Sequence, residues 1–492
     1  MDPLAAPSLS PPPRRADEVL WLGVVALVAA SHLIFALLDQ RPPTDQVFLF
    51  SAVPVVRDAL AMGQPGRLVG LLSESGGWYN LLVVGLLEAV GPSPARLRAF
   101  GMLASVFIVG LSGLLARRIA GPRAALAGAA LAGATPMIVV WGRQVWFHVP
   151  EAALILGLLA LVHGDPRLSR RGAPIGAALL GAAALTLRET GLFWMLTLLP
   201  VLLTGRGRRW LPVLALWLVA AWVPVSRTLP YLSNKLGARA HYAAQVAPFG
   251  EQLAFMVGWG VLVLGVVGVA AALWRRSGGP VDRLRLVLMA WLGSGPALVL
   301  LFHAGLDNHT LFAVGLAILG GVGLARLGLS RLAVALFLVY GALALAPEGS
   351  ALAPARARVA AVLAPQRSEP IDDYARPWQK VRLDALRSSL SQCAPPCEIL
   401  VYNGLFHPGS DSAGGTELWS LGVQARLVPV GSRPPRAMLA AHFGAAAAHR
   451  CADSASGDAA LFTQLTAANG LVPLWERQVT RDCALVWWAP GP

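Results

Sequence analysis

Ionisable side chains stand where several long apolar stretches of this 492-residue chain begin or end, and together they could carry out acid–base or anion-binding chemistry. Asp45 lies seven residues beyond the first apolar stretch, 19–38, and a carboxylate there could act as a general base. Taken singly, Asp45 could also be a solvated loop acid or a helix N-cap, and arginines at such positions could snorkel or form ion pairs such as Arg143–Glu151. Convergence from five segments at similar depth favours a shared site. The further candidates are Arg98, Arg143, Glu151, Arg188, His303 and His309.

Long apolar stretches must position these groups. A helix needs about 20 apolar residues to cross a bilayer. The chain is 56% hydrophobic and 13% charged, with a mean hydropathy of +0.60. We therefore predict an α-helical polytopic membrane protein with about 11 transmembrane helices in residues 19–346. The predicted spans are 19–38, 96–116, 124–141, 149–163, 173–187, 190–204, 210–225, 253–273, 286–302, 310–325 and 331–346.

The connecting loops divide by charge. Every second loop is rich in arginine, as in Arg117-Arg118 and Arg208-Arg209, whereas the alternate loops hold acids such as Asp45 and Glu151. Positive charge resists translocation, so the arginine-rich loops and the N-terminal tail, 1–18, are predicted to be cytoplasmic. The first span is too long for a cleaved signal peptide, and an odd number of spans places the C-terminal part outside. The net charge of +14 then reflects topology. No basic, aromatic-interleaved patch indicates nucleic-acid binding.

Two large outer segments are predicted within the membrane part. The first, 39–95, ends in an apolar stretch, 79–90, which is too short to cross and is predicted to lie at the interface with Trp78 and Tyr79 as aromatic anchors. Tyr79 and Asn80 are therefore further binding candidates. The second segment, 226–252, is expected to be a loop that could close over the site, and it contributes Lys235 and Arg239.

A linker rich in proline, alanine and arginine, 347–370, precedes a small soluble α/β domain, 371–492. Expected strands are 398–402, 425–430, 471–475 and 484–488, and expected helices are 376–391 and 458–468. All the cysteines lie in this domain, which favours two disulfides over a zinc site because no histidine spacing supports zinc. Cys393–Cys397 with Cys451–Cys483 is the favoured pairing among three.

The order of these parts resembles the GT-C superfamily of integral-membrane glycosyltransferases, nearest to the protein O-mannosyltransferase and aminoarabinose-transferase branch. The resemblance covers about residues 20–330. It rests on Asp45 in a long first outer loop, a following helix that ends at Gly91, a span headed by Arg98, the Arg117-Arg118 loop, and a small-residue span that closes on Gly142-Arg143. The individual motifs are short and varied, so their order along the chain supports the resemblance more than any single motif does.

The resemblance implies transfer of a sugar, a hexose or a pentose, from a polyprenyl-phosphate carrier to a lipid, polysaccharide or protein acceptor. Asp45 takes the general-base position. The arginine and histidine candidates would stabilise negative charge on the phosphate leaving group, and Glu151 would orient Arg143 or bind sugar hydroxyls. No paired-acid metal motif is present, so no cofactor or obligatory metal is expected. The chain uses many arginines and few lysines, which is typical of a GC-rich bacterial genome. We therefore expect the protein in the bacterial inner membrane, with its C-terminal domain in the periplasm.

Several departures and alternatives remain. The branch usually has Asp-Glu where this chain has Asp45-Gln46, and its Pro-Pro-Leu segment is replaced by Gly76-Gly77-Trp78. A late span that often begins with arginine is preceded here by His309. A transporter or lipid flippase would also place charges near a cavity, although usually at broken helices in mid-bilayer. A non-catalytic assembly protein with a partner-binding tail is the other alternative.

Overall fold

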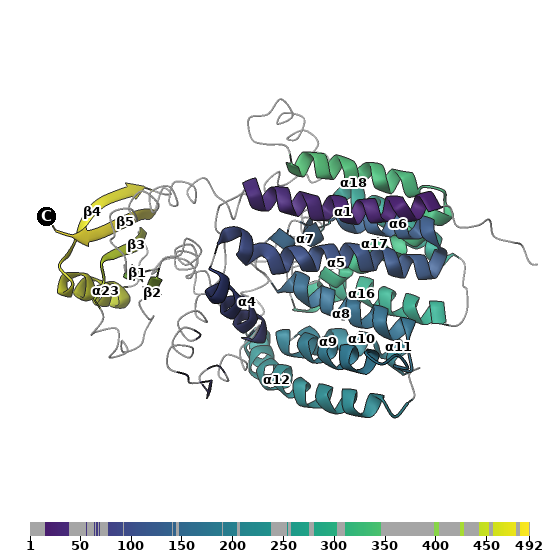
Figure 1. Ribbon diagram of the computed structural model, residues 1–492, viewed down its shortest axis with the longest axis horizontal. Helices are drawn as coiled ribbons and strands as arrows, with labels where there is room; N and C mark the ends of the chain where they lie inside the picture. Colours follow the sequence, from purple (N-terminus) through teal and green to yellow (C-terminus); the bar gives the residue numbers. More distant parts are fainter. Residues whose placement is uncertain are drawn as a thin grey trace, which may run out of the picture.

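A computed structural model places a helical bundle and a small C-terminal sheet domain in one chain (Figure 1). The residues that it describes are 15–38, 56, 63, 65, 66, 68, 77–91, 93–139, 141–143, 147–188, 190–203, 207–237, 253, 257–274, 280–302, 310–345, 398–402, 424–427, 442–451, 456–478 and 483–491.

The bundle consists of helices that lie roughly side by side (Figure 1). In chain order they are α1 (Arg15–Leu38), α4 (Gly77–Val90), α5 (Pro94–Ala120), α6 (Pro122–Ala134), α7 (Pro136–Val139), the 3₁₀ turn η1 (Trp141–Arg143), α8 (His148–Gly164), α9 (Ala173–Leu187), α10 (Thr190–Thr197), α11 (Leu199–Leu202), α12 (Trp210–Gly237), α15 (Trp259–Leu273), α16 (Pro280–Phe302), α17 (Thr310–Arg326) and α18 (Ser330–Leu345).

Two of the described helices, Ala16–Leu37 and Ala95–Ala120, are long and apolar enough to cross a membrane unaided. The pair Pro122–Ala134 and Pro136–Arg143 would make a third span that is bent by 71°. The other apolar helices are shorter. The structure thus confirms the predicted polytopic helical class, while the number of 11 crossings stays a prediction.

Local sequence explains where the long helices begin and end. The Ser93 side chain accepts a hydrogen bond from the Arg96 backbone N–H at 3.2 Å, and Pro94 occupies the first turn of α5, where a missing N–H is tolerated. Gly121, with φ +82°, ends α5, and Pro122 begins α6 at once. The resulting tight turn keeps α5 and α6 in contact.

Helix α17 lies at the centre of the bundle, and its residues from Thr310 to Leu324 are all buried. Glycines let its neighbours approach closely, because a Cβ atom at Gly323 would lie only 1.6 Å from the Gly268 carbonyl oxygen of α15. On another face, a Cβ atom at Gly321 would lie 2.4 Å from the Gly128 backbone nitrogen of α6. Helices α15, α17 and α6 therefore form a tightly packed centre.

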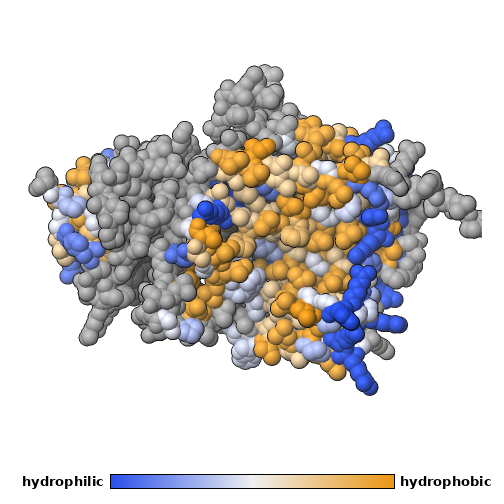
Figure 2. All heavy atoms as spheres, viewed as in Figure 1, coloured by the Kyte–Doolittle hydropathy of each residue, from blue (hydrophilic) through white to orange (hydrophobic). Residues whose placement is uncertain are grey.

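The outer surface of the bundle is a broad apolar area crossed at one end by a hydrophilic band (Figure 2). Leu218 and Phe107, for example, expose 76% and 63% of their surface. An apolar surface of this extent is typical of contact with lipid. Exposed arginines gather at the ends of the helices that the charge pattern assigned to one side: Arg117, Arg118, Arg123, Arg167, Arg170, Arg171, Arg208, Arg209, Arg283, Arg326 and Arg331.

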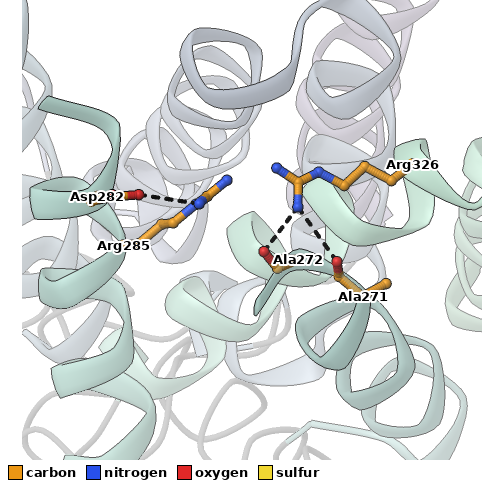
Figure 3. Close-up of polar contacts among 5 residues, drawn as sticks. All are labelled: Ala271, Ala272, Asp282, Arg285 and Arg326. Carbon is orange, nitrogen blue, oxygen red and sulfur yellow. Dashed lines mark hydrogen bonds and ion pairs between the residues drawn. The ribbon is translucent and has the colours of Figure 1, made fainter. Parts of the chain in front are cut away.

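Some arginines at this end tie helix ends together (Figure 3). Arg326 of α17 donates to the carbonyl oxygens of Ala271 and Ala272 at 3.4 and 2.9 Å, which satisfies the last turn of α15. Arg285 of α16 bonds to Asp282 at 3.2 Å within its own helix. The Arg326 contacts therefore join α17 to α15 where their apolar faces end, whereas the Arg285 contact stays within α16.

The predicted spans correspond to the observed helices, but α15 begins at Trp259, six residues after its predicted start, and α16 begins at Pro280, six residues before its predicted start. Three further differences are larger. Predicted span 124–141 is broken into α6, α7 and η1, and predicted span 190–204 into α10 and α11. Helix α12 runs on to Gly237, twelve residues beyond the predicted end of its span. Lys235 therefore lies in a helix, and the prediction that it lies in a loop was wrong. Arg239 lies outside the described residues.

The C-terminal domain is a five-stranded sheet with the order β2-β1-β3-β5-β4 and one described helix, α23 (Ser456–Ala468). Strands β1 and β2 are parallel, as are β1 and β3, whereas β5 runs antiparallel to β3 and β4. Leu400, Phe443, Phe462 and Leu465 form its core. The strands are β1 (Glu398–Tyr402), β2 (Gln424–Leu427), β3 (Ala445–Cys451), β4 (Leu471–Gln478) and β5 (Cys483–Pro490).

The sheet bears on two predictions. Four strands and the 458–468 helix were predicted, but β3 was missed because its first four residues are alanines, which favour helix over strand. The register pairs Cys451 directly with Cys483. Opposed residues in antiparallel strands have Cα atoms about 4.5–5.5 Å apart, within the range that a disulfide needs, so the favoured pairing stays a prediction with compatible backbone geometry. Cys393, Cys397, the linker 347–370 and the predicted helix 376–391 lie outside the described residues.

Candidate active site

Arg143 is buried at the end of the bundle opposite the exposed arginines. It lies in η1, which follows α7, and only 2% of its surface is exposed. Its Nε–H donates to Nδ1 of His32 in α1 at 3.3 Å, and a terminal nitrogen donates to Oγ of Ser31 at 3.4 Å. Its guanidinium also lies over the Phe35 ring, 4.5 Å from the centroid. Helix α1 thus supplies three successive contacts to one buried cation.

The contacts of His32 define its tautomer. A guanidinium can only donate, so Nδ1 of His32 must accept the hydrogen bond from Arg143. The proton of the neutral ring then lies on Nε2, which donates to Oγ of Ser105 in α5 at 3.0 Å. Gly142 permits this closeness, because a Cβ atom there would lie 2.6 Å from Cβ of Ser105. A neutral imidazole therefore joins α5, α1 and η1.

Arg98 lies near the same aromatic ring as Arg143. It sits in the second turn of α5, is 3% exposed, and its guanidinium carbon lies 5.0 Å from the Phe35 centroid. Two guanidinium groups thus share one ring. Aromatic rings attract cations through their negative faces, which helps to hold both arginines in a desolvated place.

A second charged group surrounds Arg188, which follows α9 directly. Arg188 forms an ion pair at 4.0 Å with Glu151 in the first turn of α8 and a close hydrogen bond to Nδ1 of His148. Its guanidinium carbon lies 5.6 Å from the Phe147 ring centroid. Glu151 also accepts a 2.6 Å hydrogen bond from Thr190. Glu151 therefore orients Arg188, and not Arg143 as the sequence suggested.

Helix α4 packs against the helix ends that carry these groups. Tyr79 is 3% exposed, and its ring meets Phe100 of α5 edge-on, with the centroids 6.1 Å apart. Trp78 donates from its indole nitrogen to the Ala183 carbonyl of α9 at 3.2 Å, and Asn80 is buried. The prediction that Trp78 and Tyr79 anchor the helix in the membrane interface was therefore wrong for Tyr79, which is a packing residue. Val83, Val84, Leu87, Leu97 and Leu187 complete this apolar cluster.

An apolar cavity of about 300 Å³ reaches Arg143 from the side of the bundle. It lies between α1, the α6–α7 junction and α18, and Ser31 and Arg143 form its polar end. Leu27 and Leu338 on its walls are 50% and 51% exposed, so the cavity opens on the apolar surface. The remaining lining residues are Val28, Gly133, Ala134, Thr135, Pro136, Val139, Phe337, Tyr340 and Gly341.

The structure brings part of the predicted site together. Arg98 and Arg143 share Phe35, Arg188 and Glu151 pair, and Tyr79 and Asn80 lie in α4 beside α5. The structure does not describe Asp45, Arg239, His303 or His309, and it describes Lys235 only as part of the helical backbone of α12. The general base and the two histidines therefore stay predictions.

His32 and His148 were missed from the sequence, and each accepts a hydrogen bond from an arginine of the candidate site. A signal for His32 was present, because an ionisable residue inside an apolar span is a functional candidate by default. His148 had no such signal, since it stands at a predicted span end among aromatic residues. Its role depends on where α9 brings Arg188.

The arrangement is suited to an anion. Among the residues that the structure describes, the buried guanidiniums of Arg98 and Arg143 and the part-buried guanidinium of Arg188 lie near this end of the bundle, and the Glu151 carboxylate is paired with Arg188. Positive charge in excess in a desolvated place binds phosphate or stabilises developing negative charge. No group of three or more potential metal ligands comes together within the described ranges.

Comparison with known proteins connects this architecture to solved structures. No protein-family model and no curated protein sequence matches the chain. The crystal structure of ArnT from Cupriavidus metallidurans bound to undecaprenyl phosphate is similar, with a TM-score of 0.57 and 16% identity over 96% of this chain and 98% of that chain. The apo state of the same protein gives a TM-score of 0.55 and 17% identity over the same shares.

An oligosaccharyltransferase from Archaeoglobus fulgidus matches more weakly, with a TM-score of 0.47 and 10% identity over 84% of this chain and 64% of that chain. The ArnT matches extend over nearly the whole of both chains, including the C-terminal domain. The likeness to ArnT therefore confirms the predicted fold, a helical bundle with a small α/β domain after it.

Proposed function

We propose that the chain is an integral-membrane glycosyltransferase that takes a sugar from a polyprenyl-phosphate carrier. The observation that carries the proposal is the junction of an apolar cavity with the buried guanidinium of Arg143. A polyprenyl phosphate has the same division, an apolar chain and an anionic head. The similar ArnT structure has undecaprenyl phosphate bound, which supports a carrier of this class.

The reaction would proceed by direct displacement at the anomeric carbon. An acceptor hydroxyl attacks this carbon, Asp45 takes the hydroxyl proton, and the bond from the anomeric carbon to the phosphate oxygen breaks. The electron pair of that bond leaves with the polyprenyl phosphate. Because this leaving group is a stable anion, it needs stabilisation of charge more than protonation.

The cationic residues would stabilise the phosphate as charge develops on it. Arg98 and Arg143 are held over Phe35, and Arg188 is held by Glu151, so their guanidiniums are oriented before a ligand arrives. Preoriented donors stabilise charge without reorganisation during the reaction. Tyr79 and Asn80 position α4 beside this site, and His303, His309, Lys235 and Arg239 stay candidates for further contacts to the donor.

The proposed site faces the periplasm of a bacterial cell. Helix α5 carries Arg98 in its second turn and Arg117 and Arg118 in its last, so the buried and the exposed arginines occupy opposite ends of the bundle. Exposed arginines mark the cytoplasmic side. Figure 1 shows the C-terminal sheet beyond the end where α4 lies, and Figure 2 shows the hydrophilic band at the other end, which supports a periplasmic C-terminal domain.

Replacement of the proposed base tests the function. Membranes with the wild-type protein, incubated with radiolabelled polyprenyl-phosphate hexose or pentose, should pass label to a lipid, polysaccharide or protein fraction. Asp45→Asn should reduce this transfer by at least about 100-fold, the usual contribution of a general base, with unchanged protein level and insertion. Asp17→Asn, in α1 at the arginine-rich end, is the matched control and should retain activity.

The labelled fraction and the accepted donor would also identify the acceptor class and the sugar type. Full sugar transfer by Asp45→Asn would contradict the proposal that Asp45 is the general base. Absence of any transfer, with the donor moved across the membrane intact, would instead favour the transporter alternative. Absence of both would favour a non-catalytic assembly protein that uses its C-terminal domain to bind a partner.

A further inference from the structure

A second cavity, of about 350 Å³, lies at the arginine-rich end of the bundle, far along the helices from the candidate active site. The end of α8, the loop that follows it, α11 and the first turn of α16 enclose this cavity. Its lining includes Arg167, Arg283, His163, Asp165, Pro166 and Val201. Because α8 carries Glu151 in its first turn and His163 in its last, nearly the whole length of this helix separates the two sites.

Two arginines are available to a ligand in this cavity. Arg167 and Arg283 are exposed and form no hydrogen bond or ion pair with the rest of the described chain. Their neighbours are engaged: Arg118 donates to the Ala160 carbonyl at 2.6 Å, and Arg209 donates to the Leu168 carbonyl at 3.0 Å. The neighbouring arginines therefore hold backbone near the cavity, while Arg167 and Arg283 keep donors that no described residue accepts from.

The one carboxylate in the lining does not neutralise these arginines. Asp165 accepts hydrogen bonds from the backbone N–H groups of Ser169 and Arg170, at 3.0 and 2.9 Å, and from the Ser169 hydroxyl at 2.9 Å. Both carboxylate oxygens are thus used to close the loop that carries Arg167. The loop is held in place, and the cavity keeps an excess of positive charge.

The cavity lies where the cationic band meets the apolar surface. Leu286, one turn after Arg283 in α16, is 59% exposed, and Leu203, directly after α11, is 71% exposed. Val201 and Pro166 supply apolar wall inside the cavity. The lining thus combines guanidinium donors with apolar wall, and exposed leucines follow two of the lining residues within one turn along the chain, which is the environment of a lipid headgroup at a membrane boundary.

We propose that this cavity binds the phosphodiester headgroup of an anionic membrane phospholipid, such as phosphatidylglycerol. Arg167 and Arg283 donate to the phosphate oxygens, as arginines do in charge-assisted phosphate contacts. Basic pockets between transmembrane helices on the cytoplasmic side hold anionic headgroups by the same chemistry. The flanking leucines favour a lipid over a free phosphate compound. This site is independent of the proposed sugar transfer.

Lipid binding to the full-length protein tests the proposal. Purified, delipidated protein in detergent is titrated with phosphatidylglycerol or phosphatidylcholine, and bound lipid is counted by native mass spectrometry. Wild type should prefer phosphatidylglycerol. Arg167→Gln and Arg283→Gln should each weaken phosphatidylglycerol binding about fivefold, the contribution of one arginine near an anionic lipid, and leave phosphatidylcholine unchanged.

A matched pair of substitutions controls for net charge. Arg171→Gln with Arg208→Gln removes the same charge from the same end but touches neither cavity wall nor lining, so it should keep the preference. If the control pair and the pair Arg167→Gln with Arg283→Gln lose equal affinity for phosphatidylglycerol, the proposal is wrong. The lipid would then be attracted by the positive charge of the whole helix end and not by this cavity. Displacement of phosphatidylglycerol by millimolar inorganic phosphate would contradict the proposal that the ligand is a lipid and would indicate a soluble phosphate ligand. Thermal unfolding of each variant verifies that it is folded.

Discussion

Each of two arginines near the candidate active site is held by an imidazole that accepts its hydrogen bond. Arg143 donates to His32, and Arg188 donates to His148. An acceptor that carries no charge fixes the direction of a guanidinium without cancelling its charge, unlike a carboxylate. The two groups differ in that Arg188 also forms an ion pair with Glu151.

His32 should therefore contribute to stability as well as to the site. His32→Leu keeps the apolar volume but removes the buried hydrogen bonds that His32 makes with Arg143 and Ser105, so the free energy of unfolding should fall by about 1–3 kcal/mol. Detergent-titration unfolding followed by tryptophan fluorescence measures this change. Ser31→Ala loses one long contact of 3.4 Å and should change stability by about 0.5 kcal/mol or less. Similar values for the two variants would contradict the prediction.

Asp165 should make stability depend on pH. Hydrogen bonds from the backbone N–H groups of Arg170 and Ser169 hold the pKa of Asp165 below its ordinary value of 3.8. A lowered pKa in the folded state stabilises the protein above pH 3.8, and this stabilisation is lost as the pH falls through the lowered pKa. Asp165→Asn should therefore unfold at a lower temperature than wild type at pH 7, and the difference should shrink in acid.

Thermal unfolding of both proteins across this pH range tests the Asp165 prediction. Ser169→Ala serves as a partial control, because it removes the hydroxyl bond and leaves both backbone bonds to the carboxylate. It should keep most of the pH dependence. A constant difference between wild type and Asp165→Asn at every pH would show that the carboxylate charge is not involved.

At the scale of elements, the centre of the bundle depends on glycine contacts between helices. Gly323→Ala places a methyl group against the Gly268 carbonyl, so α17 and α15 must separate, and the free energy of unfolding should fall by about 1–3 kcal/mol or more. Gly293→Ala in α16 meets no atom within 4 Å and should be neutral or stabilising by up to about 1 kcal/mol. Unfolding measured in the same detergent series compares them. A neutral Gly323→Ala would mean that these helices can move apart freely.

Helix positions could be predicted from the sequence because apolar length and capping residues are local properties. Ser93-Pro94 and Gly121-Pro122 mark helix boundaries by their own chemistry. Strand β3 could not be predicted, since Ala445 to Ala448 gain their extended conformation from pairing with β1 and β5. The extension of α12 past its apolar stretch was missed for a related reason, because hydropathy reports membrane depth and not helix length.

The sequence was enough to predict which residues belong to the candidate site, but not which of them contact one another. Charge at predicted span ends was enough to select Arg98, Arg143, Arg188 and Glu151. Which of these touch depends on how α1, α8 and α9 pack, and that is a long-range property. The sequence therefore suggested Arg143 with Glu151, whereas packing joins Glu151 to Arg188. The two cavities had no counterpart in the sequence for the same reason.

At the scale of the whole molecule, the separation of the two arginine populations predicts an orientation that labelling can test. The membrane part contains no cysteine, so single cysteines can be introduced there as reporters. Arg208→Cys should react with a membrane-impermeant maleimide in inverted vesicles and not in spheroplasts. Ala89→Cys, in α4, should show the reverse pattern.

The native cysteines of the C-terminal domain provide an internal control for this orientation. If Cys451 and Cys483 form the predicted disulfide, they should resist the maleimide until a reductant is added, and then react in spheroplasts. Reaction of Arg208→Cys from outside would reverse the proposed topology. It would also move the candidate active site to the cytoplasmic side.

The cavity between α1 and α18 opens on the apolar flank of the bundle, beside Leu27 and Leu338. A ligand that enters by this route travels in two dimensions. Its rate of arrival depends on how many molecules share each unit of bilayer area and on lateral diffusion, and a bulk concentration has no direct meaning for it. Saturation curves for such a ligand should therefore collapse onto one line when they are plotted against its mole fraction in the lipid or detergent.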